Sequence, residues 1–103
     1  MAKIKTFKNR VKEEEKLWLM EPEEFKSFLK EHEEDENLKE LIKEYFRMDA
    51  EIYAGFSRNS MKFNNGAISE ESAALNTMAY VRMGRELAEI QSKIIEVYVK
   101  NLP

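Results

Sequence analysis

The chain has 103 residues and a formal net charge of −3, with three glycines, two prolines and abundant glutamate and lysine, a composition that favours helix nearly throughout. It contains no cysteine, which excludes disulfides, thiol catalysis and thiolate metal sites and fits a cytoplasmic location. No apolar run approaches the roughly 20 residues that span a bilayer, and no apolar signal core follows the N-terminus, so we expect a soluble, unexported protein without a membrane partner.

Residues 1–20 predict a basic amphipathic helix. Its apolar face carries Ile4, Phe7, Val11 and Trp18 at helical spacing. We expect this face to dock on the rest of the chain, with Trp18, Leu17 and Leu19 as its apolar anchor. The cationic side chains of this segment are Lys3, Lys5, Lys8, Arg10 and Lys12.

These cations allow a second interpretation, in which the segment binds the phosphates of a nucleic acid. A basic amphipathic helix can also lie on an anionic membrane surface. Both alternatives are disfavoured because residues 13–36 are strongly acidic and weaken the approach of polyanions. Docking, with the basic face in water, is the favoured interpretation.

A second helix is predicted over residues 22–34. Pro22 suits the first helical position, and the acidic residues after it suit the positive end of the helix dipole. Phe25, Phe28, Leu29 and His32 share one side. The Glu-x-x-His spacing of di-iron bundles is absent around His32, so we interpret this histidine as structural. The acidic run 31–36 predicts a solvated helix junction, with a docking surface for a basic partner as the alternative.

A third helix is predicted over residues 37–60, before the turn signal Asn64-Asn65-Gly66. Aromatic residues cluster at its middle and tip. Most of them are expected in the core, and any excess would mark a partner surface because tyrosine and phenylalanine are enriched there. The apolar stripe of this helix comprises Leu38, Leu41, Tyr45, Met48 and Ile52.

The fourth helix, predicted over residues 69–101 with Ser69 as its N-cap, organises the chain. Its heptad stripe is longer than the third helix can cover in an antiparallel hairpin. The overhang from Ile90 to Val97 therefore needs cover from the first helix, the second helix or a second subunit. We predict a homodimer through this stripe, which comprises Tyr80, Met83, Leu87, Ile90, Ile94 and Val97.

Pairing the third and fourth helices about residue 65 predicts specific contacts across the hairpin. Phe46 should fill a notch at Gly84, and Leu75 should stand opposite Gly55. Arg82 falls opposite Asp49, where a half-buried ion pair would fix the register of the two helices.

The sequence thus predicts one all-α domain over residues 1–103, a helix-bundle type with a long antiparallel hairpin and one or two shorter N-terminal helices packed across it. No nucleophile is paired with a general base, so we expect no enzyme, no cofactor and no metal site. The predicted function is a protein–protein interaction or assembly module working through helix–helix packing. Its partners are a second copy and an unidentified protein. The alternative is a nucleic-acid-associated accessory protein using the basic N-terminal segment.

Overall fold

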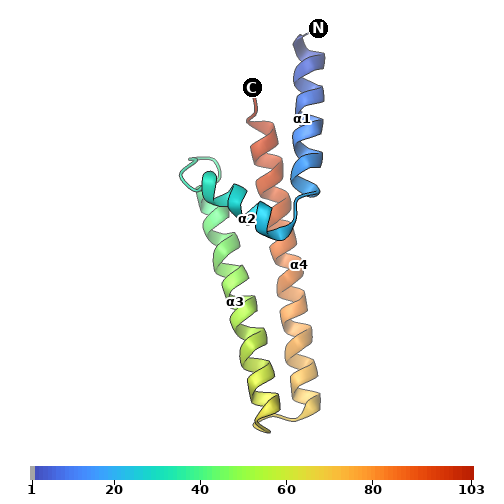
Figure 1. Cartoon of the computed structure of the whole chain (residues 1–103), viewed down its shortest axis with the longest axis vertical. Coiled ribbons are helices and arrows are strands. Elements are labelled where there is room, and N and C mark those ends of the chain that lie inside the picture. Colours follow the sequence, from blue (N-terminus) through green and yellow to red (C-terminus); the bar gives the residue numbers. More distant parts are fainter. Residues whose placement is uncertain (1) are drawn as a thin grey trace. The chain divides into compact units, whose positions relative to one another are not determined.

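The computed structural model describes residues 2–103, with side chains from residue 9 onward. The described residues form helices and loops without strands, which confirms the predicted all-α fold (Figure 1). No described helix combines the length and the apolar character needed to cross a membrane. The helices are α1 (Ala2–Trp18), α2 (Pro22–Glu31), α3 (Lys39–Asn64) and α4 (Glu70–Lys100).

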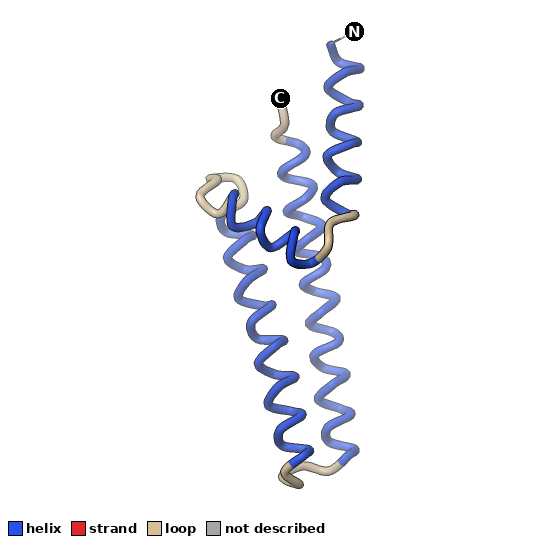
Figure 2. The backbone as a smooth tube through the Cα atoms, viewed as in Figure 1, coloured by secondary structure: helices blue, strands red, loops and turns tan. Residues whose placement is uncertain are grey.

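Local chemistry sets the limits of α2. Pro22 opens this helix, as predicted, and the backbone N–H of His32 donates to the carbonyl of Leu29 at its end. The helix is shorter than predicted because the acidic residues beyond it form the loop to α3 (Figure 2). In that loop, Asp35 accepts the Asn37 N–H at its side chain (2.9 Å), an arrangement that competes with helix.

The tip of the α3–α4 hairpin is closed by capping at both helix ends. α3 continues to Asn64, beyond the predicted end at residue 60, because Gly66 with φ 74° terminates it in the left-handed conformation. The Ala67 N–H donates to the Lys62 carbonyl at 2.8 Å, the bond expected of such a cap. At the start of α4, the Ser72 N–H donates to Ser69 Oγ at 3.1 Å, which confirms the predicted N-cap.

The chain divides into two compact units. Unit 1 combines the N-terminal residues to Lys43 with Gln91–Pro103, and unit 2 is Glu44–Ile90. Unit 2 consists of the facing parts of α3 and α4, which run antiparallel side by side (Figure 1). The core of unit 1 contains Leu17, Phe25, Phe28, Leu29, Leu38, Ile42, Ile94 and Ile95.

Unit 1 supplies the cover that the C-terminal part of α4 requires. Ile94 and Ile95 are fully buried there. The ring of Phe28, on α2, meets the ring of Tyr98 edge-on at 5.0 Å between centroids. The chain's own helices therefore cover this part of the overhang, which is one of the expected alternatives.

The docked face of α1 differs from the predicted one. Leu17 is 1% exposed, whereas Trp18 is 48% exposed and Val11 is exposed as well. Adjacent helical residues point about 100° apart, so one docking surface cannot centre on both Leu17 and Trp18. Of the predicted anchor, Leu17 is therefore confirmed as buried, whereas Trp18 and Leu19, which is 81% exposed, are not. Ile4 and Phe7 lie outside the described side chains.

The glycine notches also differ from the prediction. A Cβ atom at Gly55 would lie 2.1 Å from Cε1 of Tyr80, so the Tyr80 ring, and not Leu75, packs on this glycine. No atom of the described residues lies within 4 Å of the corresponding position at Gly84, so Phe46 does not fill it. The two helices pair antiparallel as expected. Their register and rotation differ from the prediction, so Tyr80 packs on Gly55 and Phe46 does not pack on Gly84.

Candidate interaction surfaces

Unit 2 buries few apolar side chains. Tyr45 and Met48 are buried near its start, and towards the tip the buried positions are Gly55 and the polar Asn59. Large apolar side chains of the same unit remain in water, and Tyr53 is 77% exposed. The hairpin is therefore a pair of helices with a thin contact line between them. The exposed large apolar residues of unit 2 are Tyr53, Phe56, Met61, Phe63, Leu75, Met78 and Val81.

The predicted dimer stripe of α4 is partly used inside the chain. Ile94 is fully buried, so its side chain cannot reach a partner without opening the core of unit 1. The ring of Tyr80 lies 5.4 Å from that of Phe56. The half-buried members of the stripe are Tyr80, Met83, Leu87, Ile90 and Val97. A dimer contact through them stays a prediction, as does the pairing of half-buried Asp49 with exposed Arg82.

A polar cluster joins α3 and α4 near the tip. The amide of Asn59 donates to the Ala73 carbonyl (3.0 Å) and to Thr77 Oγ1 (3.2 Å). Its side-chain oxygen accepts from Asn76 Nδ2 at 3.0 Å. These bonds satisfy a buried polar side chain and fix the register of the helices, as buried asparagines do in coiled coils. This role of Asn59 was not predicted from the sequence, although a polar residue in an apolar stripe is a recognisable signal.

Removing the Asn59 side chain should loosen the hairpin. We expect Asn59→Ala to lower the free energy of unfolding by about 1–3 kcal/mol, because its partners lose their bonds in a part-buried setting. Urea titration followed by circular dichroism measures the change. Exposed Ser60→Ala is the matched control, and an equal loss in both variants would contradict the role of Asn59.

Charged residues of α3 form ion pairs along one side of unit 2. Arg47 donates to the carboxylate of Glu44 and, at 2.8 Å, to that of Glu51. The hydrogen bond from Arg47 lowers the pKa of Glu44, and the same bond raises the pKa of Arg47. Arg47 and Glu51 are exposed and Glu44 is half-buried, so these ion pairs lie on a solvated side of the helix and add little stability.

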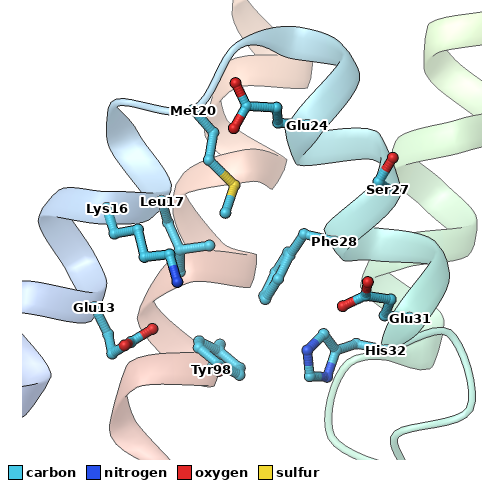
Figure 3. Close-up of a pocket in the computed structure, with 10 residues that line it drawn as sticks. All are labelled: Glu13, Lys16, Leu17, Met20, Glu24, Ser27, Phe28, Glu31, His32 and Tyr98. Atoms are coloured by element: carbon cyan, nitrogen blue, oxygen red, sulfur yellow. The ribbon is translucent and has the colours of Figure 1, made fainter.

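A groove of about 370 Å³ opens in unit 1 between α1, α2 and the end of α4 (Figure 3). The His32 ring lies 4.5 Å from Phe28 and 5.2 Å from Tyr98, so it packs as part of the wall. Burial, and secondly the charge of Glu13, raise the pKa of the Tyr98 hydroxyl. The lining residues are Glu13, Lys16, Leu17, Met20, Glu24, Ser27, Phe28, Glu31, His32 and Tyr98.

The groove places no activated nucleophile beside a base. Its one serine, Ser27, donates its hydroxyl to the Glu23 carbonyl at 3.1 Å, the usual helix back-bond. Among the described residues no three histidine, aspartate or glutamate side chains come together as a metal site would require. The groove is thus a polar hollow between packed helices.

The basic N-terminal segment is only partly described. The side chains of Lys3, Lys5 and Lys8 lie outside the described residues. Arg10 donates from Nη2 to the Leu102 carbonyl at 3.1 Å, while its buried Nε has no hydrogen-bond partner. Lys12 is exposed. One of the predicted phosphate-binding cations therefore serves a contact inside unit 1.

Comparison of the chain with family models, with curated proteins and with solved structures finds no match.

Proposed function

We propose that the protein is a non-enzymatic interaction or assembly module that acts as a homodimer through helix–helix packing of unit 2. A cytoplasmic location is part of this proposal. The observation that carries it is the exposure of large apolar side chains along Glu44–Ile90. Two helices cannot shelter their apolar surfaces from water by packing on each other alone, and four helices around a common core can.

The free energy of burying apolar side chains favours a partner for unit 2. Full burial of one large apolar side chain stabilises by about 1.5–3 kcal/mol, and several such side chains of unit 2 remain in water. Contiguous exposed apolar surface marks interaction sites in folded proteins. The basic N-terminal segment offers weaker support for a nucleic-acid role, because Arg10 is engaged within the chain.

The oligomeric state tests the proposal directly. We expect light scattering to give a mass near twice 12.2 kDa at micromolar concentration, because association of two copies removes the exposed apolar side chains of unit 2 from water. A mass that stays at the monomer value up to about 100 µM would refute the homodimer.

Deletion of residues 1–12 tests whether this segment is docked on the rest of the chain or binds phosphates. We expect the deletion to lower the melting temperature by about 4–8 °C for each 1 kcal/mol lost, because it removes the contact of Arg10 with Leu102. Retention on heparin should change little. Unchanged melting with lost retention would instead favour the nucleic-acid alternative.

A further inference from the structure

The two sides of the unit 2 hairpin differ sharply in charge. Contacts between α3 and α4 join Gly55 to Tyr80 and Asn59 to Ala73, Asn76 and Thr77. The line of contact residues is continued at helical spacing by the buried or half-buried Met48 and Ile52 of α3 and Met83 and Leu87 of α4. In an antiparallel pair of right-handed helices, the residue directly after each contact residue lies on the same side of the pair. Seen from one end of the pair, the two antiparallel helices wind in opposite senses. Their contact residues also point in opposite directions, each towards the other helix, so the two reversals cancel.

One side, here called the charged face, consists of the residues directly before each contact residue. It includes Arg47 with its partners Glu44 and Glu51, it continues with Arg58, Arg82 and Glu86, and Leu75 is its exposed large apolar residue. The opposite side, here called the apolar face, consists of the residues directly after each contact residue, and of these only Asp49 is charged. The apolar face comprises Phe46, Asp49, Tyr53, Phe56 and Ser60 of α3 and Ala74, Thr77, Val81, Gly84 and Ala88 of α4.

The apolar face is also uneven in shape. The α3 half carries large rings, with Tyr53 standing almost free in water. The α4 half carries small residues, and Gly84 opens onto empty space. Glycine in the middle of a helix reduces stability relative to alanine, and in the part of the chain that the structure describes no atom lies within 4 Å of the space it leaves. The large rings of α3 thus form a ridge on the apolar face, and Gly84 of α4 forms a notch beside this ridge.

We propose that a second copy of the chain covers this face, with α3 of each copy lying on α4 of the other and Tyr53 filling the notch at Gly84 of the partner subunit. This inference rests on the proposed function and specifies the surface that carries it. Gly55 meets Tyr80, so residue 53 stands near the level of residue 82, beside Val81 and Gly84. A two-fold axis parallel to the long axis of the hairpins leaves the height of each residue along that axis unchanged. It therefore places the large rings of α3 in each copy against the small residues of α4 in the other copy.

The size of the face suits a second copy. Each helix contributes about 20 residues to unit 2, a length of about 30 Å, and two helices spaced 8–10 Å apart give a face of about 20 Å in width. The resulting footprint of about 600 Å² approaches the roughly 800 Å² that each partner buries in a standard interface. The alternative packing, α3 on α3, would set rings against rings and leave the Gly84 notch open.

Cysteine crosslinking tests the arrangement, because the natural chain has no cysteine. We expect a mixture of full-length Tyr53→Cys and Gly84→Cys chains to form a covalent dimer on mild oxidation, while either variant alone crosslinks far less. Disulfides require Cα atoms within about 7 Å, so the product reports direct apposition. Efficient crosslinking of Tyr53→Cys alone would overturn the proposed pairing.

A substitution in the notch tests whether this face forms the interface. The Cβ of Gly84→Leu has no atom of the described residues within 4 Å, so the helices should form as before, which circular dichroism checks. We expect the dimer dissociation constant to rise at least ten-fold. Ala79→Leu, on the charged face, is the matched control and should leave the constant unchanged.

The outcomes separate the two proposals. A dimer that survives Gly84→Leu unchanged would overturn this face while leaving the homodimer in place. A natural chain that stays monomeric to about 100 µM would overturn both.

Discussion

Leu29→Ala is expected to lower the free energy of unfolding by about 2–5 kcal/mol. Leu29 is 0% exposed in the core of unit 1, so its removal leaves a cavity that the packed neighbours can only partly fill. Domains of this size are stable by about 5–15 kcal/mol, so the loss removes a large share of the total.

Leu19→Ala provides the matched control, because the same atoms are removed from a side chain that is 81% exposed. Its effect should stay within about 0.5 kcal/mol, as for most surface substitutions. Chemical denaturation followed by circular dichroism compares the two variants. Similar midpoints for both would show that unit 1 is not organised around Leu29.

Gly55→Leu should also destabilise the protein, by about 1–3 kcal/mol, despite the better helix propensity of leucine. Even the first added atom would lie 2.1 Å from the Tyr80 ring, so the ring must leave its place against Phe56. Removing the ring should relieve the clash. The double variant Gly55→Leu with Tyr80→Ala should therefore lose less stability than the sum of the single variants.

Gly84→Ala is the control for Gly55→Leu, and it should have the opposite sign. Nothing lies within 4 Å of the added Cβ, so the gain in helix propensity, about 0.5–1 kcal/mol, remains uncompensated. Both glycine variants are measured by tryptophan fluorescence at a dilution where the chain is monomeric, because dimerisation alters apparent stability. A loss on Gly84→Ala under these conditions would contradict an open notch.

The sequence by itself determined the helices and the chemistry at their ends. Pro22 and Ser69 set helix starts, and Gly66 ends α3, because each acts on backbone groups within one turn of its own position. The burial of Phe25, Phe28 and Leu29 on one side of α2 followed from their spacing alone.

The tertiary structure decided which side of each helix turns inward. Periodicity did not show which member of the predicted α1 anchor is buried, because a shift of one residue rotates a helix face by about 100°. For the same reason it did not show that Tyr80 packs on Gly55 or that Phe46 leaves the notch at Gly84 unfilled. That rotation depends on contacts between residues far apart in the chain, such as Asn59 with Ala73 and Arg10 with Leu102. Spacing within one helix carries no information about such contacts, so the packing of the neighbouring helix fixed the rotation.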